Sequence, residues 1–210
     1  MFITFEGTEG SGKSTQIPLL AEFLRQKGYP VVTTREPGGT PIGDQIRLIL
    51  ADMKNSAMQP RTEILLFQAS RAQHVEEFIL PHLDQGHIIL CDRFADSTLA
   101  YQGYGYQNDL EQIEAIIDFA TGGLKPDLTV LLEIDAESGL QRRAQGGEWN
   151  RLDAFGTAFY QRVCEGYHKL IQADPGRWIA IDASQTVEQV QDELRRVVLE
   201  RITRLRKSMD

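Results

Sequence analysis

The chain has 210 residues, 41% of them hydrophobic, which is enough for a substantial buried core within one domain. Its formal net charge of −8 argues against a general nucleic-acid-binding surface, so we expect no nucleic-acid partner. No apolar run approaches bilayer-spanning length, Met1 leads straight into a strand pattern, and two distant cysteines imply no disulfide framework, so we expect a cytosolic protein without membrane contact.

Short segments rich in Val, Ile, Leu, Phe or Thr alternate with longer helical segments along the chain. The predicted strands are 2–6, 31–35, 87–91, 128–134 and 178–182. The predicted helices are 13–27, 42–52, 60–84, 108–121, 136–145, 154–173 and 186–206. This alternation favours an α/β fold, a three-layer αβα sandwich around a five-stranded parallel sheet. Pro18 removes one hydrogen bond inside the first helix, which predicts a slight bend there.

Residues 7–14 form a complete G-x-x-x-x-G-K-S phosphate-binding loop between the first strand and the first helix, which predicts a fold of the P-loop NTPase type. Backbone N–H groups and the helix N-terminus are expected to bind the polyphosphate of a nucleoside triphosphate. Lys13 is expected to reach the β and γ phosphates, and Ser14 to offer its hydroxyl to Mg²⁺. The predicted ATP-binding residues here are Gly7, Thr8, Glu9, Gly10, Ser11, Gly12, Lys13, Ser14 and Thr15.

Charged residues follow the second and third strands, at the sheet edge where ligands of parallel α/β proteins bind. Arg35 opens the run Arg-Glu-Pro-Gly-Gly-Thr, and Asp92 and Arg93 follow an apolar strand. These arginines suit a second anion that faces the triphosphate. Asp92 ends an apolar strand, a position from which an acid contacts the magnesium shell through water. The alternative is that Asp92 only anchors the phosphate-binding loop by hydrogen bonding.

Two helical spacings add further candidates. Phe67 and Arg71 are four residues apart and share one helix face, as do Ser97 and Tyr101. Phe67 follows an apolar run, so a place in the core is the alternative. We interpret Cys91 as a buried free thiol and all four histidines as surface or partly buried residues without a metal role.

Together and in order, these motifs resemble bacterial thymidylate kinase. The matching elements are G-x-E-G-x-G-K-S-T-Q, R-E-P-G-G-T, the helix with Phe67 and Arg71, D-R-F and S-x-x-A-Y-Q, and they run from residue 3 to about 183. The resemblance implies one nucleoside monophosphate kinase domain over 1–210 that transfers the γ-phosphate of ATP to dTMP with Mg²⁺, giving dTDP and ADP. It also implies a homodimer packed through helices.

Two other functions remain as alternatives. One is a kinase of the same fold that acts on another nucleoside monophosphate or on a deoxynucleoside. The other is a nucleotide-dependent switch or binding module, against which the absence of the guanine-reading Asn-Lys-x-Asp run counts.

The resemblance assigns the phosphate and sugar of dTMP to one group of residues. Arg35 and Arg93 would hold the dTMP phosphate, with Pro37 beside them, because planar guanidinium groups bind phosphate oxygens bidentately. For either arginine the alternative is a salt bridge with an acidic neighbour. Glu9 would bond the sugar 3′-hydroxyl, or else be a solvated loop acid, and Tyr101 would close on the deoxyribose, or else only pack.

The base is assigned to a second group. Phe67 would stack on the thymine ring, and Arg71, which only donates, would reach the thymine O4. Ser97 and Gln102 are candidates for the N3 edge of the base.

A basic segment at about 142–153 is expected to be a lid. Some relatives carry an arginine just after the acid of the phosphate-binding loop, where this chain has Gly10, so the charge would come from Arg142, Arg143 or Arg151. Arg142 could instead pack on the adenine, whose predicted edge is 182–185, and Arg151 could pair with Asp153. The predicted catalytic residues are Lys13, Glu9, Arg93, Arg143 and Arg151.

Overall fold

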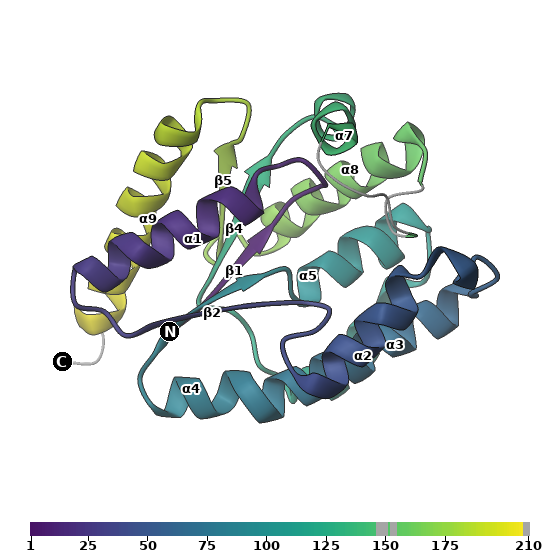
Figure 1. The fold of residues 1–210 in the computed structure, drawn as a ribbon, viewed down its shortest axis with the longest axis horizontal. Coiled ribbons are helices and arrows are strands. Elements are labelled where there is room, and N and C mark those ends of the chain that lie inside the picture. Colours follow the sequence, from purple (N-terminus) through teal and green to yellow (C-terminus); the bar gives the residue numbers. More distant parts are fainter. Residues whose placement is uncertain (146–150, 152–154, 208–210) are drawn as a thin grey trace.

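A five-stranded parallel sheet forms the centre of the computed structural model, which describes residues 1–145, 151 and 155–207 (Figure 1). The strands are β1 (Phe2–Glu6), β2 (Val31–Arg35), β3 (Ile88–Asp92), β4 (Leu128–Glu133) and β5 (Trp178–Asp182). They lie in the order β2-β3-β1-β4-β5, and each neighbouring pair is parallel. The predicted α/β fold is confirmed, and the predicted strands differ from these only by one residue at the ends of β3 and β4.

Helices connect successive strands. They are α1 (Lys13–Gln26), α2 (Pro41–Ala51), α3 (Pro60–His74), α4 (Leu80–Asp84), α5 (Ala95–Thr98), α6 (Leu110–Thr121), α7 (Ala136–Ala144), α8 (Thr157–Ala173) and α9 (Val187–Lys207). Shorter helical turns are η1 (Met53–Asn55), η2 (Val75–Ile79) and η3 (Leu99–Gly105), of which η2 and η3 are π-helical. No helix in the described ranges is long and apolar enough to cross a membrane.

Two predicted helical regions differ from the structure. The predicted helix 60–84 is α3, η2 and α4 in succession: Pro81 has no N–H for the carbonyl of Glu77, and the chain widens into a π-helical turn before it. Helices α5 and η3 were not among the predicted helices, since 95–105 lacks the apolar periodicity of a surface helix, although Ser97 and Tyr101 were noted at helical spacing. Helix α1 continues through Pro18, and a bend there stays a prediction.

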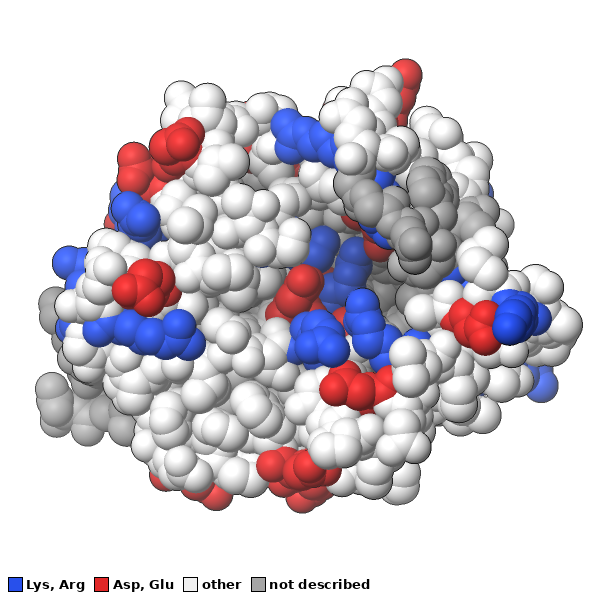
Figure 2. Space-filling model, viewed as in Figure 1, with Lys and Arg blue, Asp and Glu red and all other residues white. Residues whose placement is uncertain are grey.

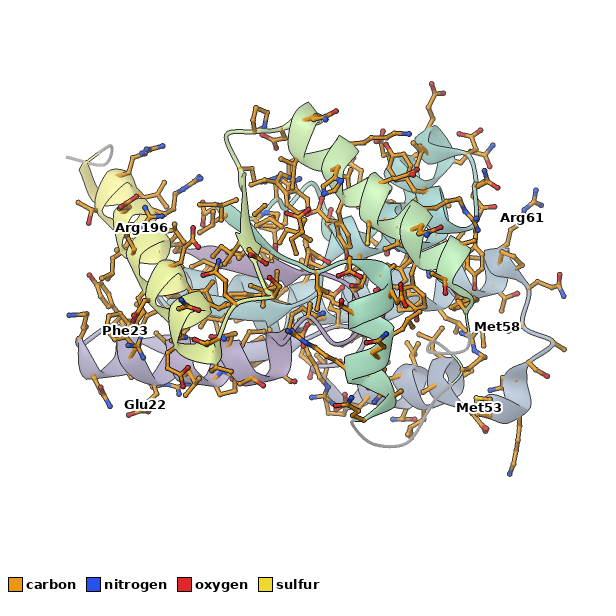
Figure 3. The ribbon with its side chains drawn as sticks, turned by 90° about the horizontal axis from the view of Figure 1, so that it is seen from above. Glu22, Phe23, Met53, Met58, Arg61 and Arg196 are labelled. Atoms are coloured by element: carbon orange, nitrogen blue, oxygen red, sulfur yellow. The ribbon has the colours of Figure 1, made fainter. Side chains whose placement is uncertain are left out.

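The two faces of the sheet pack against different helices. On one face, Ile3 and Phe5 of β1 lie in a core cluster with Leu20 of α1 and Leu194 of α9. The opposite face of the sheet packs against η2, η3 and α8. Alternate residues of a strand point to opposite faces, and every strand here is rich in apolar residues, so both faces are covered. Figure 3 shows α1 and α9 side by side at one end, with Phe23 and Arg196 labelled there.

One histidine contradicts the sequence interpretation. His74 is fully buried, so the prediction of surface or partly buried histidines is wrong for this residue. Its ring has a partner on each nitrogen, Thr34 Oγ1 at 2.7 Å from Nε2 and Glu36 Oε1 at 3.0 Å from Nδ1, which removes the need for water. Cys91 is a fully buried free thiol, as predicted.

Candidate active site

The phosphate-binding loop joins β1 to α1 at the carboxyl edge of the sheet. Gly7, Gly10 and Gly12 have φ angles of 140°, 77° and 89°, a region that side chains other than glycine rarely enter. Gly12 is also the N-cap residue of α1. The three glycines therefore turn the loop so that its backbone N–H groups lie at the positive end of the α1 dipole.

Lys13 is buried within this loop. Its Nζ donates to the carbonyls of Gly7 and Thr8 at 2.9 Å and 3.1 Å and to Ser11 Oγ at 3.1 Å. Burial and, after it, the charge of Arg93 lower the pKa of Lys13 to about 8. The loop amine and the arginine after β3 thus lie close enough to repel each other.

Helix α7 packs directly on the loop through two glycines. A Cβ on Gly10 would lie 2.2 Å from the Gly139 carbonyl oxygen, and one on Gly139 would lie 2.7 Å from the carbonyl oxygen of Glu9. A larger residue at position 10 would therefore displace α7. The arginine that some relatives place here has no room in this arrangement.

Glu9 connects the loop with the segment after β3. Arg93 Nη2 lies 2.8 Å from Glu9 Oε1, and the Tyr101 hydroxyl donates to Glu9 Oε2 at 2.7 Å. Arg93 also donates to the Tyr101 and Ser97 hydroxyls at 3.1 Å and 3.2 Å, and its φ of 66° turns it off the strand. These residues form a rim shared by the loop and a neighbouring pocket.

Beneath the rim lies Glu6, the last residue of β1 and fully buried. Its carboxylate accepts from the Phe94 N–H at 2.9 Å and from the Tyr167 hydroxyl at 2.9 Å, and from the Ser97 hydroxyl. Burial and, after it, the charge of Asp96 raise the pKa of Glu6 to about 7. Glu6 therefore holds in place the turn after β3 that contains Arg93.

Two further arginines lie on the β2 side. Arg35 is half exposed and pairs with Asp44 at 3.0 Å. Arg47 of α2 donates to the Pro37 carbonyl at 3.0 Å, and its pKa is lowered by burial and then by the charges of Arg35 and Arg93. Figure 2 shows Lys and Arg side chains gathered around a hollow in the middle of this face. The hollow is therefore suited to an anion.

One pocket contains most of the predicted substrate residues. It is lined by Glu9, Glu36, Pro37, Arg47, Phe67, Arg71, Arg93, Phe94, Ser97, Thr98, Tyr101, Gln102 and Phe155. Phe67 is half-buried and borders the pocket. Arg35 is not among the residues that line it.

Arg71 lies on the wall of this pocket and is fully buried. Its Nε binds Glu36 Oε2 at 2.8 Å, and its Nη1 donates to Gln68 Oε1 and Thr98 Oγ1 at 2.7 Å and 3.1 Å. Its Nη2 donates to the Phe94 carbonyl at 2.9 Å. Four bonds hold the guanidinium in one plane before any ligand arrives.

Comparison with known proteins agrees with this geometry. A protein-family model described as Thymidylate kinase matches residues 5–194. The chain belongs to the thymidylate kinase family. Thymidylate kinase from Roseiflexus sp. (strain RS-1) is 51% identical over 220 residues, covering 98% of this chain and 97% of that protein. Thymidylate kinase from Exiguobacterium sp. (strain ATCC BAA-1283 / AT1b) is 49% identical, with 96% and 95% covered.

A solved structure of the same family has the same fold. The crystal structure of thymidylate kinase from Ehrlichia chaffeensis aligns with a TM-score of 0.77 at 36% identity, covering 95% of this chain and 98% of that chain. The family resemblance drawn from the motifs is therefore confirmed.

The resemblance implies a metal ion at the phosphates, and two residues fit one. Ser14 is exposed at the start of α1. Asp92 ends β3, and its buried Oδ1 has no hydrogen-bond partner among the described residues. An unpaired buried carboxylate oxygen suits a water-mediated contact to Mg²⁺.

The predicted lid arginines lie in three places. Arg142 Nη1 donates to the Ala183 carbonyl at 2.8 Å, next to the predicted adenine edge, and Arg143 is half-buried on α7. Arg151 Nη1 lies 2.6 Å from Glu63 Oε2, and its Nε donates to the Leu50 carbonyl at 2.7 Å. Residues 146–150 and 152–154 lie outside the described residues, among them Asp153, the predicted alternative partner of Arg151.

Glu63, His74, Glu6 and Arg47 were not predicted as site residues from the sequence. Glu63 and His74 lie on one face of α3 with the predicted Phe67 and Arg71, at spacings of four, four and three residues, and three of these four residues are fully buried. A charged stripe at helical spacing inside a folded core was the signal that could have found Glu63 and His74. Glu6 and Arg47 gave no comparable signal.

Proposed function

We propose that this protein transfers the γ-phosphate of ATP to dTMP, giving dTDP and ADP. The observation that carries the proposal is the Arg93–Glu9 ion pair, 2.8 Å long, which joins the triphosphate loop to the acceptor pocket along one rim. Two anion sites that share a rim bring donor and acceptor phosphates into line. Membership in the thymidylate kinase family supports dTMP as the acceptor.

On the donor side, loop N–H groups and Lys13 bind the β and γ phosphates. Ser14 and Asp92 would hold a magnesium ion, which offsets the charge on the phosphates of ATP when it is bound. Arg142, whose guanidinium reaches the Ala183 carbonyl, lies where it could cover the adenine.

On the acceptor side, Arg93, Arg47 and Arg35 surround the dTMP phosphate, and Glu9 and Tyr101 meet the sugar. When dTMP binds, Arg93 exchanges part of its pairing with Glu9 for phosphate oxygens, which bind guanidinium bidentately. The attacking phosphate oxygen is already anionic and needs no general base. The residues accelerate transfer by alignment and charge neutralisation.

At the base, the half-buried Phe67 offers its ring for offset stacking on thymine. Arg71 has five N–H groups, four of which bond described residues, so one on Nη2 is left to donate to O4. Cytosine has an amino group at that position, where a second donor would face the first. Ser97, bonded to Glu6 and Arg93, lies at the phosphate end of the pocket.

A coupled assay of ADP release across a panel of monophosphates tests the proposal. With ATP and Mg²⁺, turnover should be far faster on dTMP than on dCMP, dGMP or UMP. Equal use of dCMP would overturn the assignment of Arg71. A deoxynucleoside kinase would make the phosphate arginines redundant, so Arg93→Ala would then leave turnover nearly intact. ATP hydrolysis that is indifferent to dTMP would point to a switch or binding module.

A cytosolic location stays a prediction. We also propose that two copies of the chain pair through α2 and α3. Several large apolar side chains are exposed on α2, on α3 and on the η1 turn between them, namely Ile42, Leu48, Ile49, Met53 and Leu65. Figure 3 places Met53 and Met58 at the end of the molecule away from Arg196 of α9. Light scattering should give twice the monomer mass, and Leu48→Arg should reduce it to the monomer. A monomer mass for the unchanged protein would contradict the dimer.

A further inference from the structure

Gln102 of η3 has a fixed orientation inside the acceptor pocket. It is 4% exposed, and its side-chain Nε2 donates to Glu63 Oε1 at 2.8 Å. Asn108 Nδ2 donates to the backbone carbonyl of Gln102 at 2.8 Å, which holds the backbone in place as well. The side chain therefore has a buried partner for its nitrogen end.

The partner of that nitrogen can only accept. Glu63 is 1% exposed, and its other oxygen, Oε2, lies 2.6 Å from Arg151 Nη1 and accepts from the Tyr106 hydroxyl at 3.4 Å. In an ion pair with a guanidinium the carboxylate is charged and has no proton to donate. A primary amide beside it must present its NH₂ group, because its carbonyl would find no donor there.

We propose that Glu63 determines specificity for the base by fixing the amide of Gln102. With the nitrogen turned to Glu63, the carbonyl oxygen is the end that Gln102 offers to a ligand in the pocket. That oxygen accepts a hydrogen bond from the N3–H of thymine. The inference rests on the proposed function, in which Gln102 lines the dTMP site.

The chemistry of the base edges makes this orientation selective. Thymine presents a donor at N3 and an acceptor at O4, whereas cytosine presents an acceptor at N3 and a donor at N4. Gln102 held as an acceptor and Arg71 held as a donor match thymine at both positions and oppose cytosine at both. An amide free to turn over would offer its NH₂ to the N3 of cytosine and remove one of the two mismatches.

Glu63→Gln tests the proposal, because a glutamine of the same shape can donate to the Gln102 carbonyl as well as accept from its nitrogen. We would measure kcat/KM for dTMP, dUMP and dCMP in the unchanged protein and in the variant. The ratio of dTMP to dCMP should fall by about tenfold or more, the loss typical of one buried hydrogen-bond mismatch. The ratio of dTMP to dUMP, which have the same N3 and O4 groups, should change by less than about twofold.

A matched control separates this effect from the loss of a buried charge. Asp96 is also buried and paired with an arginine, Arg177 at 2.6 Å, but has no contact with Gln102. Asp96→Asn should leave the dTMP to dCMP ratio unchanged. If Glu63→Gln does not fold with Arg151 unpaired, the double change Glu63→Gln with Arg151→Met removes both charges and should lower the same ratio.

The possible results separate a wrong role for Glu63 from a wrong proposed function. If the unchanged protein prefers dTMP and either Glu63 variant keeps that preference in full, the role of Glu63 is wrong and the proposed function stands. If both substrate ratios fall together, Glu63 only supports the shape of the pocket and the inference is wrong. If the unchanged protein does not phosphorylate dTMP, the proposed function and the inference fail together.

Discussion

The phosphate-binding loop and the base-facing wall of the acceptor pocket are built in opposite ways. Lys13 bonds to groups of its own loop, the farthest being the Gly7 carbonyl six residues away. Arg71 bonds to Glu36 and to the Phe94 carbonyl, 35 and 23 residues away. One site is a single continuous segment, and the other exists only when distant segments pack together.

The difference follows from what each site binds. A polyphosphate needs many donors and positive potential, which a turn of backbone N–H groups provides whatever its neighbours are. A base edge needs one donor and one acceptor at fixed angles, so the side chains that carry them must be held by other buried groups. We therefore expect changes at the wall to affect the free energy of unfolding as well as substrate choice, and changes in the loop to affect ATP binding and turnover but not the free energy of unfolding.

The largest expected effect is on stability at the wall. Arg71→Ala leaves the buried Glu36 carboxylate without its guanidinium partner, which should lower the free energy of unfolding by about 3–5 kcal/mol. Arg35, whose side chain is 52% exposed beside Asp44, is the matched control, and Arg35→Ala should cost less than about 1 kcal/mol. Urea denaturation measures both. Equal losses of unfolding free energy at the two arginines would contradict a wall that depends on its buried partners.

In the loop, Lys13→Ala should reduce kcat by about 10²–10³-fold, the effect of removing a group that stabilises charge in the transition state. The free energy of unfolding should not fall, because burial already disfavours the charged amine. Lys27, an exposed residue at the end of α1, supplies the control, and Lys27→Ala should leave kcat unchanged. A normal kcat in a folded Lys13→Ala protein would contradict phosphoryl transfer at this loop.

Glu6 lies under both regions and should make stability depend on pH. Its pKa is about 7 when folded against 4.5 as the ordinary value, so the folded state holds the proton longer. The contribution to stability is complete below pH 4.5 and is lost as pH rises to 7, about 3–4 kcal/mol in all. Relative to the unchanged protein, Glu6→Gln should therefore gain about 2–3 kcal/mol between pH 5 and pH 8 in urea denaturation, whereas the surface change Glu22→Gln should gain nothing.

The smallest expected effect is on the pH dependence of ATP binding at the loop. Because the pKa of Lys13 is about 8, the amine loses its charge as pH rises above that value, and the phosphates of ATP must restore the proton. Affinity for ATP should therefore fall above pH 8, by up to about tenfold per pH unit. Calorimetric titration measures it, and Lys13→Ala should show no such fall. A pH-independent affinity between 8 and 10 would mean that Lys13 keeps its charge without ATP.

The sequence predicted the parts of this protein whose cause is local. The strands came from short apolar runs, the loop from its glycines and Lys13, and the family from motifs in order. The resemblance assigned Phe67, Arg71, Arg93 and Gln102 to one substrate, and all four line one pocket. Covalent neighbours determine a turn or a helix, so such features can be predicted from a short window of residues.

Only the tertiary structure decided which groups hold those residues in place. The bonds from Glu63 to Gln102, from Glu36 to Arg71 and His74, and from Glu6 to the turn after β3 join segments 35 to 91 residues apart. The packing of α7 on Gly10 is likewise invisible in the motif. A buried carboxylate needs a hydrogen-bond donor, because burial without one is costly in free energy. Strand order and helix packing, not distance along the chain, determine which donor lies near it.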